Sequence, residues 1–156
     1  MQSDAGGASW REHLLEDDAR IRALLARTRR VAVLGMRTEA RRDRPAFYVP
    51  AALKRAGLEI VPVPVYHPEA TEILGARVYR RVSDVPGQVD LVDVFRRPVD
   101  IPSHLDDLVA ARPGAVWFQL GIRNDEAARV LAQAGIDVVQ DRCLKVEWAR
   151  LGPGRG

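Results

Sequence analysis

The sequence has almost no cysteine. Cys143 is the single cysteine in 156 residues, so the chain cannot form an internal disulfide or a zinc site built from several cysteines. The three histidines (His13, His67 and His104) stand far apart and have no second histidine or cysteine at ligand spacing. We therefore predict no metal site.

Long apolar runs are missing as well. No run approaches the ~18 residues that a membrane-spanning helix needs. The first ten residues do not combine a basic region with an apolar stretch, so no secretory signal is visible. These absences predict a cytoplasmic protein without a membrane partner.

The excess of positive charge is small. The chain has 24 basic and 21 acidic residues, a net charge of +3, and Lys54 and Lys145 are its only lysines. A basic excess favours contacts with phosphate, but the arginines are mixed with acids and no nucleic-acid recognition motif is present. We predict no nucleic-acid partner. The length fits one domain, and the hydrophobic fraction of 47% is that of an ordinary globular protein.

Short apolar runs recur along the chain and alternate with segments of helical spacing. Unbroken apolar runs are typical of strands buried on both faces of a parallel sheet. We expect strands at 31–34, 58–63, 89–95, 115–119 and 136–140, with a minor strand at 76–80. Trp117 and Phe118 lie on one of these strands and are predicted to be core residues.

The predicted helices have recognisable ends. We expect helices at 10–30, 46–56, 102–111, 124–134 and 142–151. Gly57 and Gly135 follow two of them, and Asn124 is a good N-cap. Pro50 marks either a late start of its helix or a kink.

Strands that alternate with helices indicate an α/β fold. We predict a Rossmann-like, doubly wound, mainly parallel sheet of five to six strands with helices on both faces. It would form a single domain over residues 10–151, after a disordered lead-in at 1–9 and before a tail at 152–156.

Ligands of such sheets bind at the carboxyl ends of the strands, where the strand order reverses. With the usual order, the strand at 31–34 lies beside the strand at 89–95. The crevice is then lined by the loops 35–44 and 95–98, with 119–123 as a neighbouring wall.

The first two of these loops are rich in arginine, namely Arg37, Arg41, Arg42, Arg44, Arg96 and Arg97. Guanidinium groups bind phosphate in a bidentate manner. Composition alone does not separate a solvated loop from a phosphate site, but two basic loops at the switch point favour a phosphorylated ligand. NAD is disfavoured because the first loop has a single glycine and the second strand ends without a carboxylate. The P-loop motif is absent too.

Six segments together resemble the stand-alone CoA-binding domain family, whose fold is similar to the N-terminal domain of the succinyl-CoA synthetase α subunit. The matching stretches are 31–35, 44–50, 60–63, 90–98, 116–124 and 141–143. Each stretch alone is weak evidence for the family, but all six in the same order along the chain are a specific match. The synthetases carry further domains for acyl-CoA synthesis that this chain has no residues for, so the resemblance implies binding of CoA or an acyl-CoA.

The resemblance implies the following binding residues. The phosphate end of CoA would be held by Gly35, Met36, Arg37, Arg44 and Pro45. The nucleotide would lie near Pro62 and Val63, with Phe95 and Arg96 beside the ligand, and the pantetheine arm near Gln119 and Gly121. The family often has Gly-Ala-Ser after the first strand, where this chain has Gly35-Met36-Arg37.

No catalytic machinery stands out. Cys143 could be an activated thiol at a helix start, but a lone cysteine is more often a small buried hydrophobe. Asp93 is expected to brace a loop near the site. We expect a non-catalytic CoA-binding protein. The alternatives are a small enzyme or redox-responsive protein acting on an acyl-CoA or the CoA thiol, or a binder of another phosphorylated nucleotide. A homo-oligomer or a protein partner stays open.

Overall fold

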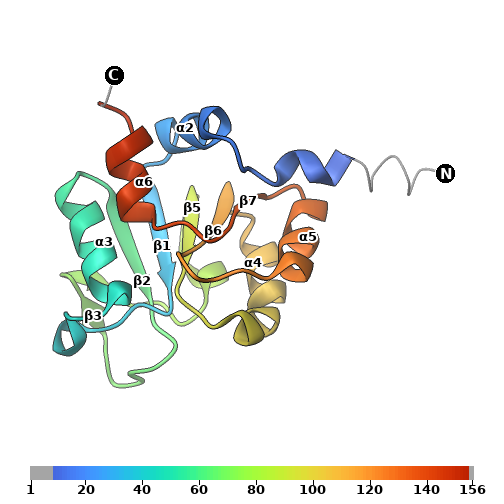
Figure 1. Ribbon diagram of the computed structural model, residues 1–156. Helices are drawn as coiled ribbons and strands as arrows, with labels where there is room; N and C mark the ends of the chain where they lie inside the picture. Colours follow the sequence, from blue (N-terminus) through green and yellow to red (C-terminus); the bar gives the residue numbers. More distant parts are fainter. Residues whose placement is uncertain (1–8, 155–156) are drawn as a thin grey trace.

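The computed structural model describes residues 9–154 and contains a five-stranded parallel sheet (Figure 1). Its order is β2-β1-β5-β6-β7. The strands are β1 (Arg30–Leu34), β2 (Glu59–Val63), β5 (Leu91–Val94), β6 (Ala115–Phe118) and β7 (Asp137–Val139). The first strand lies beside β5, so the predicted position of the strand-order reversal is confirmed. The predicted lead-in falls outside the described residues except for Ser9, as do the last two residues of the tail.

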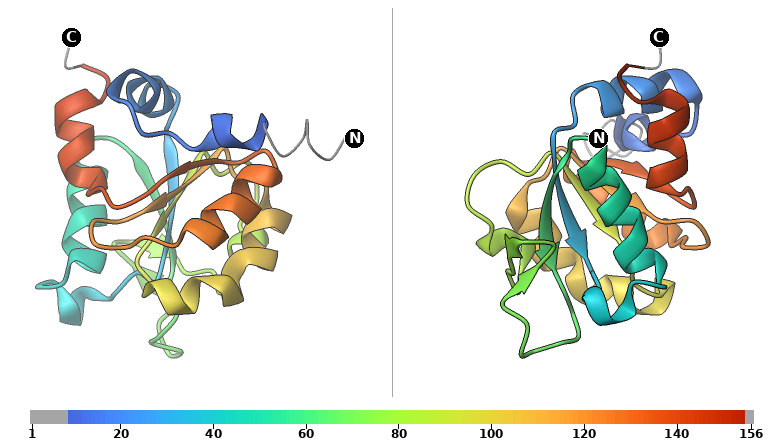
Figure 2. Two further views of the ribbon diagram at one scale, coloured as in Figure 1. Left: turned by 45° about the vertical axis from the view of Figure 1, so that its right-hand side comes forward. Right: turned by 90° about the vertical axis from the view of Figure 1, so that its left-hand side faces the viewer.

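Helices cover both faces of the sheet, which confirms the Rossmann-like α/β fold (Figure 2). One face carries α2 (Asp18–Ala26), α3 (Pro45–Arg55) and α6 (Leu144–Leu151), and the other carries α4 (Leu105–Ala111) and α5 (Asp125–Gln133). The 3-10 helices are η1 (Trp10–His13), η2 (Glu39–Arg41), η3 (Val82–Asp84) and η4 (Pro98–His104). The N-cap of α5 is confirmed, because the Asn124 side chain accepts a hydrogen bond from the N–H of Ala127 at 3.0 Å.

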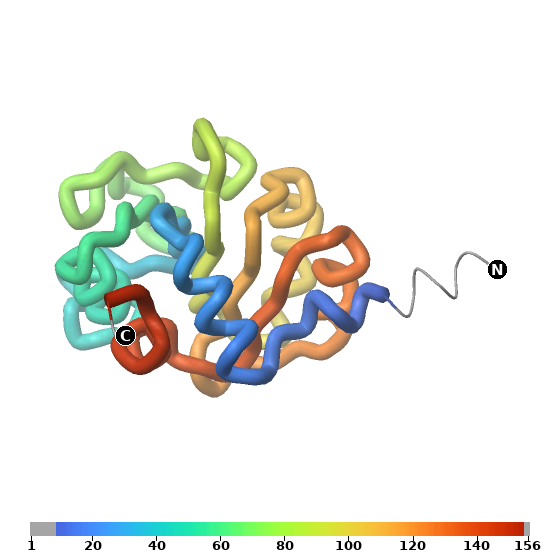
Figure 3. The backbone as a smooth tube through the Cα atoms, turned by 90° about the horizontal axis from the view of Figure 1, so that it is seen from above, coloured from blue at the N-terminus to red at the C-terminus, as the bar shows by residue number. Residues whose placement is uncertain are grey.

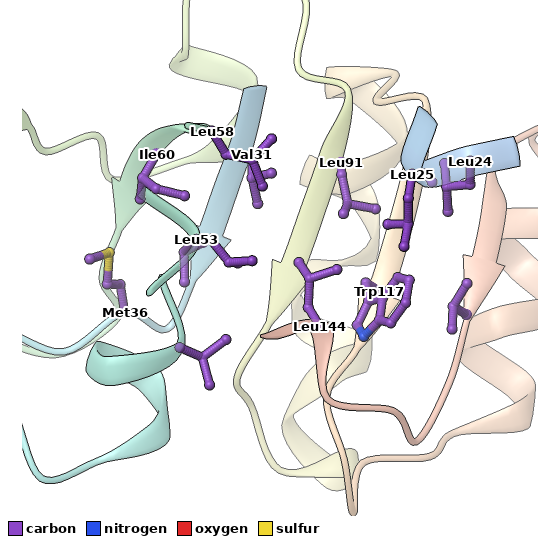
Figure 4. Packing of buried hydrophobic residues seen from close by; sticks show 14 of the residues in the cluster. Leu24, Leu25, Val31, Met36, Leu53, Leu58, Ile60, Leu91, Trp117 and Leu144 are labelled. Carbon is purple, nitrogen blue, oxygen red and sulfur yellow. The ribbon is translucent and has the colours of Figure 1, made fainter. Parts of the chain in front are cut away.

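The sheet is buried on both faces because its strands are apolar throughout. Successive side chains of a strand point to opposite faces. Val31 and Val33 therefore pack with α2, α3 and α6, whereas Ala32 and Leu34 pack with α4 and α5. Figure 4 shows the first of these two layers, where Trp117 of β6 lies near Leu144. Trp117 and Phe118 are fully buried, so their prediction as core residues is confirmed.

The single helix predicted over 10–30 is wrong. The chain forms η1, then runs extended at Leu14, and α2 begins after the N-cap Asp17, whose side chain accepts a hydrogen bond from the Arg20 N–H. Leu14 and Leu15 instead pair with Val138 of β7, and the Leu15 N–H lies 2.9 Å from the Val138 oxygen. The apolar residues at 14 and 15 thus lie against the edge of the sheet. Their spacing alone does not distinguish this position from the apolar face of a helix. Figure 3 shows this N-terminal segment passing alongside the part of the chain that holds α5.

Three other elements differ from the prediction. The helix expected over 102–111 is α-helical from Leu105, preceded by η4. The minor strand expected at 76–80 is β4 (Ala76–Arg77), which forms an antiparallel pair with β3 (Glu72–Ile73) outside the main sheet. Helix α3 begins at Pro45, so Pro50 does not mark a late start.

The two edge strands of the sheet have partners for some of their outward backbone groups. On β2, Pro62 has no N–H, and its oxygen accepts a hydrogen bond from the Tyr79 N–H at 3.0 Å. On β7, the Val138 oxygen is bound by Leu15. Both edges are therefore partly closed by segments of the same chain.

Candidate functional site

A cavity of about 520 Å³ lies at the carboxyl ends of β1, β5 and β6. Its walls come from the loops that follow these strands, from the start of α3 and from the N-cap of α6. The lining consists of Gly35, Arg37, Arg44, Pro45, Ala46, Tyr48, Val49, Tyr66, Phe95, Arg96, Arg97, Pro98, Gln119, Leu120, Gly121, Ile122 and Cys143. This is the edge where a ligand is expected in a sheet of this order.

Gly35 lets two of these loops approach closely. Its φ is +86°, and a Cβ built on it would lie 2.4 Å from the backbone oxygen of Phe95. Its N–H donates a hydrogen bond to the Val63 oxygen at 2.8 Å. The position therefore requires glycine for its backbone angle and for its lack of a side chain.

Two helix carbonyls bind the loops at the cavity. A proline in an α-helix has no N–H, so the carbonyl four residues before it is left without its helical partner. Pro50 of α3 thus frees the oxygen of Ala46, which accepts a hydrogen bond from the Arg37 N–H at 3.1 Å. At the start of the 3-10 helix η4, the oxygen of Pro98 accepts a hydrogen bond from the Asn124 side-chain amide at 2.9 Å.

The cavity wall carries positive charge that no carboxylate neutralises. Arg97 pairs with Asp100 at 2.8 Å, and this hydrogen bond lowers the pKa of the Asp100 carboxyl. By contrast, Arg37 and Arg44 form no ion pair with a carboxylate among residues 9–154. Unpaired arginines in a concave surface favour an anionic ligand.

The N-terminus of α3 adds to this positive field. Arg44 is its N-cap and Pro45 its first residue, and no side chain caps this end. The first turn of a helix carries a partial positive charge that suits a phosphate. Here Pro45 has no N–H, and the N–H groups of Phe47 and Tyr48 donate to the Arg44 oxygen, so the partial charge is the main contribution of this helix end. Arg37 and Arg44 line the same cavity as this end of α3.

Tyr66 lies between two arginines in the same wall. The Arg37 guanidinium is 4.7 Å and the Arg96 guanidinium 5.6 Å from the centre of its ring. Its hydroxyl accepts a hydrogen bond from Nη1 of Arg96 at 3.3 Å. These contacts hold the ring at the cavity although about half of it is exposed.

The loops after β6 and β7 form the far wall, because β6 and β7 lie beyond β5 in the sheet. Gln119 is buried, and its Oε1 accepts a hydrogen bond from the Leu144 N–H at 2.9 Å, which caps α6. Gly121 donates its N–H to Asp141 at 2.7 Å. Cys143, the N-cap of α6, is a free thiol in this wall.

Most of the residues predicted from the sequence come together here. Those that line the cavity are Gly35, Arg37, Arg44, Pro45, Phe95, Arg96, Gln119 and Gly121. Met36, Pro62 and Val63 are buried and lie outside the lining. Met36 packs in the core layer between the sheet and helices α2, α3 and α6, whereas Val63 packs in the layer on the other face of the sheet, with α4 and α5. Contact between any of these residues and CoA stays a prediction.

Sequence reasoning missed Tyr48, Val49 and Tyr66. Tyr48 and Val49 belong to the first turns of α3, and Tyr66 follows β2 by three residues. An aromatic residue just beyond a parallel strand is a usable signal, since the carboxyl ends of all parallel strands share one edge.

Asp93 does not brace a loop. It is fully buried on β5, and neither carboxyl oxygen has a hydrogen-bond partner in the described part of the chain. Burial raises the pKa of the Asp93 carboxyl well above its ordinary value. Asp90 does bind a loop, because its carboxylate accepts the N–H groups of Arg29 and Arg30 at 2.9 Å, but this loop precedes β1 and lies away from the cavity.

Two negative findings apply to residues 9–154. Within that range, no group of three or more histidine, cysteine, aspartate or glutamate side chains could hold a metal ion. No helix there is long and apolar enough to cross a membrane.

Comparison with known proteins identifies the family. The family model of the CoA binding domain matches residues 29–149, which include the whole sheet and every wall of the cavity. The chain belongs to this CoA-binding domain family. The family resemblance seen in the sequence is therefore confirmed, and membership supports a CoA-binding role.

Several relatives share nearly the whole family domain. YneT of Bacillus subtilis (strain 168) is 34% identical over 131 residues, which cover 84% of this chain and 93% of YneT. A solved structure from Thermus thermophilus, the cell-free protein ID.343, is 40% identical with a TM-score of 0.79, over 87% of this chain and 99% of that chain. The dinucleotide-forming acetyl-coenzyme A synthetase 1 of Ca. Korarchaeum cryptofilum is 22% identical with a TM-score of 0.62, over 76% of this chain and 26% of that chain. At that identity the likeness shows a shared fold.

Proposed function

We propose that this protein binds coenzyme A in the cavity at the carboxyl ends of the strands and performs no chemistry on it. The observation that carries the proposal is the pair of arginines without carboxylate partners, Arg37 and Arg44, beside the N-terminus of α3. CoA is a ribonucleotide with a diphosphate and a 3′-phosphate, so its nucleotide end is strongly anionic. A volume of about 520 Å³ lies within the range of sites that hold cofactors.

The arrangement of the walls supports one orientation for the ligand in this proposal. The phosphates would lie at Arg37, Arg44 and the start of α3. The pantetheine arm, which is long and carries amides, would then extend past Phe95 toward the wall formed by Gln119, Gly121 and Cys143. This order follows the sheet from β1 through β5 to β6.

The proposal of a non-catalytic role rests on the surroundings of the reactive groups. An activated nucleophile needs a base within hydrogen-bond reach. In the described part of the chain, the imidazole of His13 pairs with Asp137 and that of His104 contacts Arg96, so neither serves Cys143. Asp93 is enclosed in the core.

A second candidate, a redox-responsive role, is favoured by the presence of Cys143 in the cavity lining. The Cys143 thiolate would attack one sulfur of CoA disulfide, form a mixed disulfide and release one CoA thiolate. This role predicts a protein adduct of CoA that a reductant removes, whereas simple binding predicts none.

The first test is a titration by calorimetry with CoA, dephospho-CoA, NAD and ATP. We expect CoA to bind at micromolar concentration and NAD not to bind. Arg37→Gln and Arg44→Gln should each weaken CoA binding about tenfold or more, because a charge-assisted hydrogen bond to phosphate is lost. Arg55→Gln is the matched control, since Arg55 is an exposed arginine at the other end of α3.

The outcomes of this titration separate the candidates. Equal affinity for CoA and dephospho-CoA would mean that no arginine reads the 3′-phosphate. Preference for ATP over CoA would favour another phosphorylated nucleotide. No effect of Arg37→Gln and Arg44→Gln relative to Arg55→Gln would contradict the proposed site.

The position of the pantetheine arm can be tested on Cys143. Because Cys143 lines the far wall, a bound arm is expected to shield its thiol from alkylation. Desulfo-CoA is the suitable ligand, since it lacks the thiol that would consume the reagent. We expect saturating desulfo-CoA to slow alkylation about tenfold or more, in proportion to the occupied fraction, and NAD to have no effect. An unchanged rate with bound desulfo-CoA would remove the arm from this wall.

The finer predictions from the sequence stand beside this proposal. The cytoplasmic location, the lack of a nucleic-acid partner and a single domain over residues 10–151 stay predictions. Membership of the family does not bear on an oligomer or a protein partner.

A further inference from the structure

Arg96 differs from the other arginines of the cavity because its guanidinium is held in place. Its side chain is 12% exposed, although it lines the cavity. Three groups surround the guanidinium. Nε donates a hydrogen bond to Nε2 of His104 at 3.1 Å, Nη1 donates to the Tyr66 hydroxyl at 3.3 Å, and Nη2 lies 3.8 Å from the Asp100 carboxylate.

The hydrogen bond to His104 fixes the protonation state of that ring. An arginine can only donate, so Nε2 of His104 must accept and carries no proton. The ring is then neutral, with its proton on Nδ1. Burial and the charge of Arg96 lower the pKa of His104 below its ordinary value of 6.5, while Asp107 and Asp100 raise it by smaller amounts.

We propose that His104 is a positioning residue, which aims the Arg96 guanidinium at an anionic group of the ligand, and that protonation of His104 releases it. The inference rests on the proposed function and deepens it. A protonated ring presents an N–H and a positive charge to the N–H of Arg96, so the hydrogen bond between them is lost. Arg96 then keeps Tyr66 and Asp100, which do not reproduce the direction that His104 imposes.

The other charged groups near His104 are already engaged. Asp107 of α4 accepts hydrogen bonds from the N–H groups of Val82 and Ser83 at 2.7 and 3.1 Å, and lies 3.5 Å from Nε of Arg81. Asp100 of η4 pairs with Arg97 at 2.8 Å. Neither carboxylate can turn to the protonated ring without breaking these contacts. On the side of Arg96, Tyr66 also carries the Arg37 guanidinium on its ring, at 4.7 Å from the ring centre.

The position of His104 in the fold suits this role. It is the last residue of η4 and the N-cap of α4, and it does not line the cavity. Pro102 keeps η4 from becoming an α-helix, and Asn124 ties the start of η4 to the loop after β6. The backbone of His104 thus lies at the junction of η4 and α4, while Arg96 reaches into the site.

The test compares the wild type with two variants of His104 in calorimetric titrations with CoA from about pH 5 to pH 8, a range that brackets the ordinary histidine pKa. The side-chain oxygen of His104→Gln can replace Nε2 as acceptor but does not titrate. The side chain of His104→Leu cannot accept at all. Protonation of the CoA phosphates affects all three proteins alike, so ratios of dissociation constants isolate the ring.

We expect three results. At about pH 8 the glutamine variant should bind CoA within about threefold of the wild type, and the leucine variant about tenfold more weakly, which is the order of one charge-assisted hydrogen bond. As the pH falls, the wild type should weaken relative to the glutamine variant until it matches the leucine variant. Thermal unfolding of each variant without ligand checks that it is folded.

Two results would overturn the inference. One is a constant ratio of wild type to His104→Gln across the pH range, and the other is a leucine variant that binds as well as the wild type at pH 8. Failure of the wild type to bind CoA at any pH would instead reject the proposed function. A ligand-free NMR titration still tests the pair in that case. The Arg96 Nε–H resonance should shift with His104 protonation, and a resonance that does not shift would reject the positioning role.

Discussion

Replacing Gly35 with alanine is expected to lower the free energy of unfolding by about 3 kcal/mol or more and to abolish CoA binding. A non-glycine residue with a left-handed backbone costs about 1–2 kcal/mol. The new Cβ would in addition lie 2.4 Å from the Phe95 oxygen, a backbone atom that cannot move aside alone. The loops after β1 and β5 would be forced apart. This would displace the part of the cavity wall that carries Arg37 and Arg96.

Gly135→Ala is the matched control for this prediction. Gly135 has a φ of +84°, nearly the same as that of Gly35, but no atom lies within 4 Å of the Cβ that alanine would add. It follows α5, outside the cavity, so it should lose the conformational contribution alone, about 1–2 kcal/mol, and keep its CoA affinity. Urea unfolding and calorimetry measure both quantities. Equal losses of stability at the two positions would show that the close approach at Phe95 costs nothing.

Asp93→Asn is expected to stabilise the protein at neutral pH, by an amount that depends strongly on pH. Burial raises the pKa of the Asp93 carboxyl well above the ordinary value of 3.8, so the folded chain keeps this proton to a higher pH than the unfolded chain does. Above that value unfolding releases a proton, so rising pH favours the unfolded wild type until the pH passes the folded-state pKa. Asparagine has nearly the same shape and does not ionise.

The difference in unfolding free energy between Asp93→Asn and the wild type should therefore grow by about 1.4 kcal/mol for each pH unit above the ordinary aspartate pKa of 3.8. It should level off once the pH exceeds the folded-state pKa. Urea unfolding at about pH 5, 6 and 7 measures it, and Asp43→Asn, in an exposed loop, should differ from the wild type by less than about 0.5 kcal/mol throughout. Parallel stability curves for Asp93→Asn and the wild type would mean that Asp93 is ionised or paired in the folded protein.

The sheet was predictable because its signals are local. Each strand is a short, mainly apolar run that ends at or just before a glycine, a proline or a polar residue, and this pattern needs no knowledge of distant contacts. Gly35, Arg37 and Arg44 could be placed at the cavity for the same reason, because the carboxyl ends of parallel strands share one edge of the sheet. Arg41 and Arg42 of the same loop do not line the cavity. The segment 10–30 failed because Leu14 and Leu15 pair with Val138, a residue more than a hundred positions away.

The finer parts of the site depend on contacts that no spacing rule contains. Tyr66 is placed by two arginines from different loops, and Arg96 meets His104 only because η4 turns the chain back. The prolines are a further example. From the sequence, Pro50 marks either a late helix start or a kink, and the structure places it within α3, where it frees a carbonyl for Arg37. Asp93 is predicted from the sequence to brace a loop near the site, but its side chain is fully buried in the core.

The partial closure of both sheet edges has a consequence for how the protein behaves in concentrated solution. An open strand edge offers a row of unpaired N–H and C=O groups to which another chain can add a strand, and such addition begins many aggregates. Here Pro62 removes a donor on β2 while Tyr79 occupies its oxygen, and Leu15 occupies the oxygen of Val138 on β7. These contacts leave fewer backbone groups of β2 and β7 open to an added strand, and the second of them comes from the segment 10–17, none of whose residues lines the cavity.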